Sequence, residues 1–307
     1  SSFVFLVGLD RMTDLRLEQP WLLWLLPVAG LGLGAVTQHL SGPAARGNAL
    51  LLDEIHEPTT WIPRRMAPIV LGGTWITHLF GGSAGREGTA LQLSGSLTDA
   101  FARVARITGA DRRLLLVTAL AGGFGAVFGV PLAGTVFALE VQTIGRARYD
   151  ALVPALSAAL VGDRVVAGLG HHHTARPPFT LDVDASQLAR VAIAGLCFGV
   201  ISIAFVELTH AIRSAAARWI RPLLLRPALG GVAVVGLALL FGRDYLGLSL
   251  PLIDRALGGE QLSVAVFALK LLFTAVTLGT GFPGGEVTPL FVIGTTAGAA
   301  LADPLGL

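Results

Sequence analysis

The chain alternates between long apolar runs and short polar interruptions. The runs at 21–36 and 191–206 show no sustained alternation of polar and apolar positions, so they predict helices rather than strands. Other runs, such as 250–257, are too short to cross a bilayer, and such uneven lengths indicate broken, re-entrant helices. We expect helical segments at 1–9, 21–40, 48–57, 66–80, 89–106, 114–127, 131–141, 151–169, 188–212, 227–241, 250–257, 261–278 and 286–301, with a polar connection at 10–18.

Composition places these helices in a membrane. Of the 307 residues, 53% are hydrophobic and only 14% are charged, whereas soluble domains carry about 25% charged residues. We therefore expect an all-α, polytopic membrane protein that partners with the lipid bilayer and not with nucleic acid. The single Cys197 excludes an intramolecular disulfide. The three adjacent histidines at 171–173 lack spaced partner ligands, so we expect a solvated loop at 171–183, no metal site and no cofactor.

A carboxylate and a guanidinium interrupt the apolar pattern in the segment Gly85-Arg86-Glu87-Gly88-Thr89. Charged groups are costly inside a membrane, which makes such a pair a candidate functional site. A helix that begins near Gly85 directs its free N–H groups and positive dipole end toward an anion, and the glycines allow close approach. The segment predicts an anion site that Glu87 can enter or leave. The alternative is a structural ion pair between Arg86 and Glu87.

This segment resembles the G-K/R-E-G-P signature of CLC chloride channels and proton-coupled anion exchangers. Thr89 in place of the proline, with Gly-Gly-Glu-Val-Thr-Pro at 284–289, is similar to the fluoride/proton antiporter branch. The resemblance implies the CLC fold with two inverted repeats, a homodimer, and a cell membrane such as the bacterial inner membrane. It also implies fluoride export coupled to proton import, with Glu87 as a gate that fills an anion site when ionised and leaves it when protonated. A chloride-selective exchanger or a passive channel of this fold is the alternative.

Internal repeats support a two-part architecture. Two sets of residues recur along the chain: Leu23, Pro27, Gly30 and Gly47 after 200 residues, and Gly85, Glu87, Thr89, Leu91 and Gly95 after 199 residues. Transporters built from such repeats bind substrate near the bilayer midplane, where paired broken helices begin. We expect a first repeat with its connecting loop at 1–183 and a second repeat at 184–307.

Several features depart from the family pattern. The resemblance implies that the first helix is truncated and that later helices are missing, one of which carries a tyrosine that contacts the central anion. Neither Tyr149 nor Tyr245 matches that place. The segment 128–134 resembles the family's F-N-A-P-L-A-G turn, and Glu140 follows it. Val141 then stands where chloride exchangers carry an inner proton-relay glutamate, which again fits the fluoride branch.

Asn48 is a second candidate for contact with the anion. The pair Gly47-Asn48 is similar to the family's G-S-G-I-P segment, in which a serine hydroxyl reaches the central anion. Asn48 offers an amide N–H donor instead. Fluoride is small and tightly hydrated, so leaving water demands strong donors in compensation. The alternative for Asn48 is a helix N-cap, which asparagine also favours.

The segment Gly285-Glu286-Val287-Thr288-Pro289 resembles the family's G-I-F-A-P anion loop. By this resemblance Gly285, Val287 and Thr288 join Gly85, Arg86, Gly88 and Asn48 as anion-binding residues. A second acid beside an anion repels it unless it is protonated or paired, so Glu286 is interpreted as a proton-handling or gate-contacting residue. The alternative is a carboxylate that caps a helix start. Thr288 has two possible hydrogen-bond partners, Glu87 and Glu286.

Two further residues leave alternatives open. Lys270 lies within an apolar segment, where it either balances a carboxylate or extends its ammonium group toward the membrane surface. Ser83 lies in a G-x-S-x-G pattern near His78, which resembles the nucleophile elbow of a serine hydrolase. An elbow needs a strand before the serine, and 67–80 has a helical pattern. We therefore expect a transporter and not an enzyme.

Overall fold

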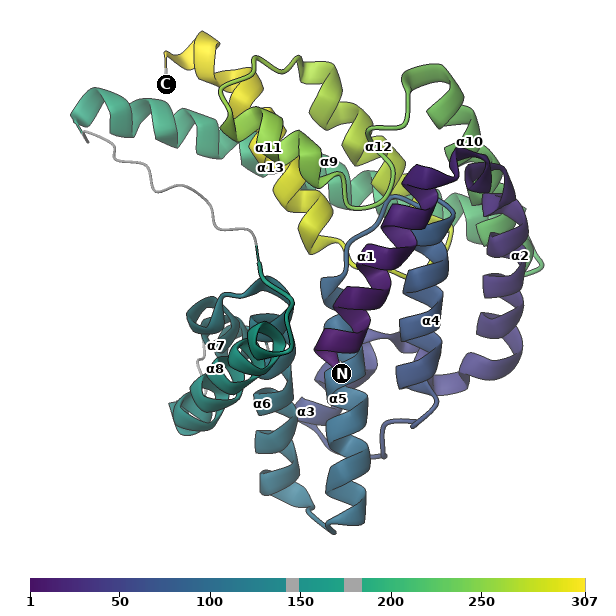
Figure 1. Cartoon of the computed structure of the whole chain (residues 1–307), viewed down its shortest axis with the longest axis vertical. Helices are drawn as coiled ribbons and strands as arrows, with labels where there is room; N and C mark the ends of the chain where they lie inside the picture. The colour runs from purple at the N-terminus through teal and green to yellow at the C-terminus, as the bar shows by residue number, and fades with distance from the viewer. Residues whose placement is uncertain (142–148, 174–183, 307) are drawn as a thin grey trace. The chain divides into compact units, whose positions relative to one another are not determined.

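The computed structural model describes residues 1–141, 149–173 and 184–306. Within these ranges the chain forms helices and helical turns, and no strand is present beyond one isolated pair of bridged residues. The expected all-α class is confirmed. The helices, labelled in Figure 1, are α1 (Ser2–Glu18), α2 (Leu26–Val36), α3 (Asn48–His56), α4 (Met66–Leu79), α5 (Glu87–Val104), α6 (Gly109–Phe128), α7 (Pro131–Glu140), α8 (Leu152–Gly168), α9 (Ala185–Trp219), α10 (Leu225–Phe241), α11 (Leu250–Leu257), α12 (Val264–Gly279) and α13 (Val287–Leu305).

Short turns join some of these helices. They are η1 (Pro20–Leu25) before α2, η2 (Thr37–Ser41) and η3 (Gly42–Arg46) between α2 and α3, and η4 (Tyr149–Ala151) before α8. The polar connection expected at 10–18 is wrong, because these residues continue α1. The buried residues of α1 are Phe5, Leu6 and Leu9, whereas Asp10, Arg11 and Asp14 are exposed, so a helix can continue through this polar segment without burying a charge.

The residues divide into two compact units. Unit 1 comprises Ser1–Leu15, Val36–Ile76 and Arg86–Thr174, and unit 2 comprises Arg16–Ala35, Thr77–Gly85 and Ala175–Leu307. The chain therefore passes between the units within α1 and α4. The repeat boundary expected at 183/184 adjoins a connection whose residues 174–183 lie outside the described part of the chain, as does Leu307. The two repeats remain a prediction.

Unit 1 is built around α6. This helix packs against α5, α7 and α8 (Figure 1), and Phe124 on α6 stacks on Phe137 of α7 with ring centroids 4.6 Å apart. Glycine allows α8 to approach closely, since a Cβ atom at Gly125 would lie 3.1 Å from Cβ of Ala159. Small residues at such contacts are typical of helix packing in membranes.

Unit 2 is built around α12, which packs against α9, α10 and α13. Unit 2 also contains a close contact between α2 and α10, in which a glycine of each helix faces a proline of the other. A Cβ atom at Gly30 would lie 2.5 Å from the carbonyl oxygen of Pro227, and one at Gly231 would lie 2.8 Å from Cα of Pro27. The two prolines stand 200 residues apart. The recurring segments around Pro27 and Pro227 thus contact each other, and each does so through a glycine.

In the described part of the chain, three segments are long and apolar enough to cross a membrane: Pro20–His56, Tyr149–Gly168 and Ala185–Trp219. The last contains α9, whose 35 residues exceed the span expected at 188–212. Only 11% of its most apolar window is buried within the chain. Such an exposed apolar helix is stable in lipid but not in water. This agrees with the membrane class expected from composition.

One buried ion cluster joins three elements of unit 1. The guanidinium of Arg112 on α6 donates to Asp99 on α5 at 2.6 Å and to Glu54 on α3 at 3.1 Å. Arg112 lies 4.6 Å from the ring centroid of Trp61, and the second oxygen of Asp99 accepts the backbone N–H of Ile62. All three charged side chains are nearly inaccessible to solvent. The cluster therefore fixes the ends of α3, α5 and α6 to one another.

Replacing Arg112 with Met is expected to destabilise the protein strongly. The change leaves two buried carboxylates without their shared cation, a loss of about 3–5 kcal/mol. The matched control is Arg46→Met, which breaks the pair of Arg46 with Asp53, whose side chains are 55% and 56% exposed; exposed pairs contribute less than about 1 kcal/mol. Thermal unfolding in detergent measures both, and equal shifts in the two variants would contradict a stabilising role for the cluster.

Candidate functional site

The candidate site contains two helix breaks with the same backbone geometry. One break lies between α4 and α5, and the other lies between α12 and α13. Gly81 and Gly281 both have positive φ angles, of 91° and 103°, which glycine adopts without steric cost. In each break the next amide bonds back into the preceding helix: Gly82 N–H donates to Thr77 at 2.7 Å and Phe282 N–H donates to Thr277 at 3.2 Å.

The backbone of the two breaks shows an offset of 200 residues and not the expected 199. Gly85 and Gly285, both in unit 2, exchange two backbone hydrogen bonds of 2.6 and 2.8 Å and stand 200 residues apart. Arg86 and Glu286 follow with φ angles of −116° and −110° as the residues before their helices. The spacing of 199 is therefore wrong. Common glycine and threonine residues produced that match, whereas the backbone makes Glu286 the counterpart of Arg86.

Glu87 is the first residue of α5 and its side chain is buried, with 1% of its surface exposed. Its carboxylate accepts the backbone N–H of Arg86 at 3.1 Å. The carboxylate thus lies at the positive end of its own helix, where free N–H groups favour negative charge. Thr89 stands where the family signature has proline, and its hydroxyl shares a hydrogen bond with the hydroxyl of Thr74 on α4.

The guanidinium of Arg86 lies over an aromatic ring, with Cζ 5.9 Å from the centroid of Phe128. Its Nε atom is shielded from solvent and has no hydrogen-bond partner among the residues that the structure describes. A buried N–H donor without an acceptor is costly. Arg86 therefore offers an unmatched donor next to Glu87, which is a feature expected of an anion site.

Asn48 does not cap its helix. The cap position of α3 belongs to Gly47, with φ 59°, and Asn48 is the first helical residue. No side-chain capping bond is found at this helix start in the described structure, and Asn48 is exposed. The capping alternative is therefore wrong. Gln92 on α5, which the sequence analysis missed, packs here: its Nε2 would lie 3.4 Å from a Cβ atom at Gly47.

Glu286 occupies the cap position of α13, but its side chain makes no capping bond within the described residues and is exposed to solvent. The capping alternative is wrong here too. Thr288 is buried and is the second residue of α13. Of the expected anion-binding residues, Asn48, Arg86 and Gly88 belong to unit 1 with Glu87. Gly85, Gly285, Val287 and Thr288 belong to unit 2.

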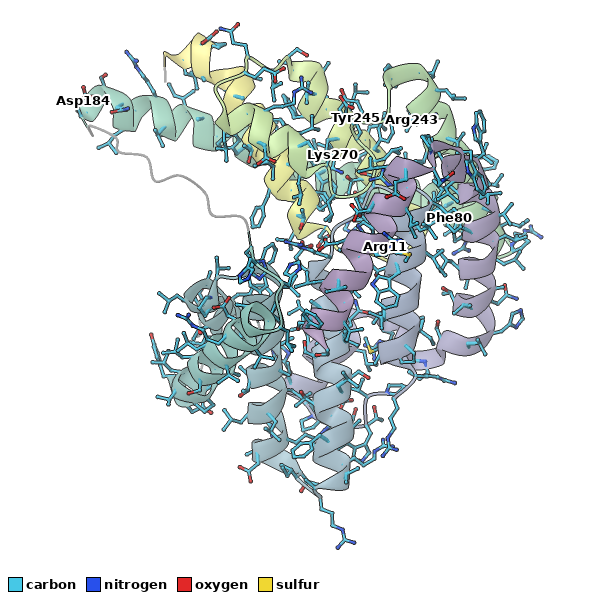
Figure 2. The ribbon with its side chains drawn as sticks, viewed as in Figure 1. Arg11, Phe80, Asp184, Arg243, Tyr245 and Lys270 are labelled. Carbon is cyan, nitrogen blue, oxygen red and sulfur yellow. The ribbon has the colours of Figure 1, made fainter. Side chains whose placement is uncertain are left out.

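The sequence analysis did not foresee the partners of Lys270, the one lysine of the chain. Lys270 on α12 is completely buried. In the described structure its Nζ donates to hydroxyl and carbonyl oxygens and not to a carboxylate. The acceptors are Gly247 O at 2.8 Å, Ser83 Oγ at 2.9 Å, Ser249 Oγ at 3.0 Å and Tyr245 O at 3.3 Å. Lys270 and Tyr245 are labelled in Figure 2. Both alternatives offered for Lys270 are therefore wrong. Its ammonium group joins the α10–α11 loop to the first helix break.

The same contacts remove the hydrolase alternative. Ser83 follows a helix and not a strand, and its hydroxyl is bonded to Lys270 and, at 3.0 Å, to the hydroxyl of Thr274. His78 directs its Nε2 atom to the carbonyl oxygen of Ala84 at 3.1 Å. An ammonium group that donates to several oxygens has no lone pair with which to take a proton from serine. Ser83 is therefore a structural residue.

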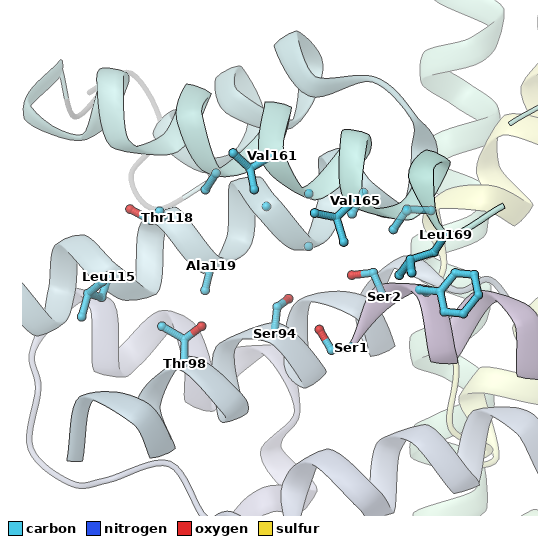
Figure 3. Close-up of a pocket in the computed structure, with 17 residues that line it drawn as sticks. Ser1, Ser2, Ser94, Thr98, Leu115, Thr118, Ala119, Val161, Val165 and Leu169 are labelled. Atoms are coloured by element: carbon cyan, nitrogen blue, oxygen red, sulfur yellow. The ribbon is translucent and has the colours of Figure 1, made fainter. Parts of the chain in front are cut away.

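Unit 1 also holds a cavity of about 430 Å³ between α1, α5, α6 and α8 (Figure 3). Small and aliphatic side chains such as Ala119, Val161 and Val165 dominate its lining. Two of its hydroxyl groups are already bonded within their own helices, Ser94 to Ala90 and Thr118 to Leu114. Because a dehydrated halide needs available donors, this cavity is a poor anion site.

Comparison with known proteins gives a consistent result. Residues 26–307 match the family described as voltage gated chloride channel. The chain is 43% identical over 317 residues to a chloride/fluoride channel protein of Pseudomonas syringae pv. tomato, covering 100% of this chain and 70% of that protein. It is 27% identical over 298 residues to the H(+)/Cl(-) exchange transporter ClcA of Vibrio vulnificus, covering 91% of this chain and 62% of the relative. The crystal structure of a CLC-type fluoride/proton antiporter superposes with a TM-score of 0.93 at 33% identity, covering 100% of this chain and 78% of that chain.

Replacing Lys270 with Met is expected to loosen the α10–α11 loop. The change removes the donor shared by buried oxygens, and each acceptor left unsatisfied costs about 1–3 kcal/mol. The amide of Gly247, which donates to Gly82 O at 3.2 Å, should then exchange its hydrogen faster, as measured by mass spectrometry in detergent. Lys270→Arg, which keeps a cation with several donors, is the matched control. Equal protection of this amide in the wild type and the Met variant would contradict the role.

Proposed function

Because the chain belongs to the voltage gated chloride channel family, we propose that it carries halide ions across a membrane and couples their movement to protons. The helical membrane architecture and the close superposition confirm the expected CLC fold. We propose fluoride as the halide and proton-coupled export as the direction, acting as a homodimer in a bacterial cell membrane. Support comes from two relatives above 30% identity, one a chloride/fluoride channel protein and the other a fluoride/proton antiporter.

The observation that carries this proposal is the position of the Glu87 carboxylate. It is buried, and it accepts a backbone N–H group at the start of its own helix. An ionised carboxylate and a halide compete for such a site because both are anions that accept N–H donors. Protonation removes the charge and with it most of the attraction to the helix end. A halide then replaces the side chain, so each proton that binds Glu87 admits an anion.

Neighbouring groups support an anion at this place. The Nε–H of Arg86 is a buried donor without an acceptor in the described chain, and Asn48 keeps its amide group uncommitted to capping. Fluoride gives up more hydration than chloride does, so it gains most from such donors. Val141 follows Glu140 where chloride exchangers of the family carry their inner glutamate, which also favours the fluoride branch.

Glu286 has a separate part in this proposal. Its backbone position matches that of Arg86, and its carboxylate is exposed at the start of α13. An exposed acid at a helix start exchanges protons readily with water. We therefore propose that Glu286 takes part in proton handling.

Changing each carboxylate to its amide tests these roles. Glu87→Gln imitates the protonated gate, so coupled proton movement should fall to background, while halide flux becomes passive or stops. Glu286→Gln keeps shape and hydrogen bonding but removes titration, so it should slow exchange and shift its pH dependence. Both variants are measured in liposomes with a fluoride gradient and a pH-sensitive dye, after size-exclusion chromatography has verified folding.

Two results would refute the assignments separately. Uphill proton movement that persists in Glu87→Gln vesicles would show that Glu87 is not the coupling group. Superimposable pH profiles for the wild type and Glu286→Gln would leave Glu286 without a part in proton handling. Chloride in place of fluoride in the same vesicles tests the alternative of a chloride exchanger, which the ClcA relative of Vibrio vulnificus favours. Halide flux in the wild type without proton movement would indicate a passive channel.

Replacing Asn48 with Ala tests its contact with the anion. The change removes one donor to a desolvated ion, a loss of about 1–3 kcal/mol. Fluoride flux should fall more than chloride flux, because fluoride loses more on dehydration. Asn48→Ser, which restores a hydroxyl donor, serves as the control and should recover part of the flux. An unchanged ratio of fluoride to chloride flux in Asn48→Ala would exclude the contact.

A further inference from the structure

A cluster of titratable side chains in unit 1 surrounds Arg86 and has no part in the site described above. It consists of Asp10 on α1 together with His171 and His173, which follow α8. We expected a solvated loop at 171–183, of which 174–183 lie outside the described residues. That expectation holds for His172, which is exposed, but it is wrong for His171 and His173, which are partly buried.

The three side chains form a series that leads inward from the solvent. The Asp10 side chain is 52% exposed, and its Oδ2 atom lies 3.4 Å from Nδ1 of His171. The side chain of His171 is only 15% exposed. Its ring centroid lies 5.3 Å from that of His173, with the two rings at 77°. A half-exposed carboxylate is thus followed by two partly buried imidazoles.

His173 is held in one orientation. Its Nε2 lies 3.1 Å from the carbonyl oxygen of Ala126, so in the neutral ring Nε2 carries the hydrogen and Nδ1 is the acceptor. The ring packs over Gly129, where φ is 70° and an added Cβ atom would lie 2.3 Å from Cδ2 of His173. Only glycine leaves room for this ring. The hydrogen bond and the packing on Gly129 therefore fix the orientation of Nδ1, the basic nitrogen of His173.

Electrostatic contacts connect this series to the gate. Arg86 lies near enough to interact with both Asp10 and His173, and it also interacts with Glu87, its neighbour in the chain. The charged groups that face Asp10 or His173 from outside the cluster are Asp14, Arg86 and Asp163, and Glu87 faces Arg86. Burial lowers the pKa of His173, and the positive charges of Arg86 and His171 lower it further. His173 is therefore neutral near pH 7 and releases an acquired proton readily.

The side chains do not converge on one point as metal ligands do. Within the described ranges, no group of three His, Cys, Asp or Glu side chains is arranged to hold a metal ion. A purely structural tie between α1 and the 171–173 segment needs only one pair of groups. Three titratable groups in sequence, ending near Arg86, match the requirements of proton transfer, since imidazole both accepts and donates protons near neutral pH.

We propose that Asp10, His171 and His173 form a proton relay between the solvent and Glu87. The relay rests on the proton-coupled exchange proposed above. Asp10 takes up a proton from water and passes it to His171, which passes one to Nδ1 of His173. His173 releases that proton from the same nitrogen toward Glu87, because its Nε2–H remains on the Ala126 carbonyl. Asp10 and His173 return to their starting states. His171 gains its proton at Nδ1 and releases one from Nε2, so its ring must exchange tautomers before the next transfer. One proton moves inward for each one taken from water.

The chain contains its own control for this relay. Asp10→Asn, His171→Asn and His173→Gln each remove titration, and the two amides chosen for the histidines keep the nitrogen that faces Asp10 or Ala126. His172→Asn changes the exposed histidine between them. Proton uptake driven by a fluoride gradient is measured in liposomes from about pH 5.5 to about pH 8, a range that brackets the ordinary histidine pKa of about 6.5.

The relay variants should slow proton uptake about threefold or more at the alkaline end, where free protons are scarce. The loss should shrink toward the acid end, and the ratio of rates in H₂O and D₂O should rise because proton delivery then limits the cycle. The number of halides exchanged per proton should not change. His172→Asn should match the wild type in every measurement.

Two outcomes would overturn the relay. One is relay variants that behave like His172→Asn. The other is a loss that is equal at every pH with an unchanged isotope ratio, which indicates a structural role. If His173→Gln fails to fold because the ring packs on Gly129, the other two variants decide the result. Absence of coupled proton movement in the wild type would refute the proposed function itself, which distinguishes that failure from failure of the relay.

Discussion

Helices that break inside an apolar protein leave backbone N–H and C=O groups that no bulk water can bond, and both breaks in this protein meet that constraint. Some of these backbone groups are satisfied by the reciprocal hydrogen bonds between Gly85 and Gly285. Another part is satisfied by Lys270, whose buried ammonium group joins Ser83 to the α10–α11 loop. The requirement to satisfy these groups therefore stabilises both breaks.

The protein uses buried charge in two different ways. Arg112 lies between two carboxylates, Glu54 and Asp99, so that cluster is close to balanced and serves to fasten three helices. Lys270 lies among hydroxyl and carbonyl oxygens instead, and Arg86 lies over the ring of Phe128 and interacts with Glu87 and Asp10. In the proposed function, Arg86 would attract a halide when Glu87 is protonated, and this attraction is strong where the surrounding dielectric constant is low.

The gate and the relay depend on each other through charge. A carboxylate at a helix start exchanges with an anion only if its proton arrives and leaves quickly compared with the anion. Burial protects the Glu87 carboxylate from water, which strengthens its bond to the backbone but slows direct protonation. A series of groups that begins at the half-exposed Asp10 would overcome that limit without opening the site to solvent.

Much of this architecture follows from local sequence alone. Apolar runs and helix breakers predicted the membrane class and most helices, and Gly85-Arg86-Glu87-Gly88-Thr89 indicated the family, because periodicity and short motifs are properties of neighbouring residues. The gating role of Glu87 stays a prediction. Other features were decided by contacts between distant segments. The pairing of Gly85 with Gly285 set the repeat spacing at 200, and loops far from Lys270 in the sequence supplied its oxygen partners. Likewise, His173 acquired its role by packing on Gly129. A single sequence contains no record of which distant residue will satisfy a buried polar group, since that choice is made only when the helices pack.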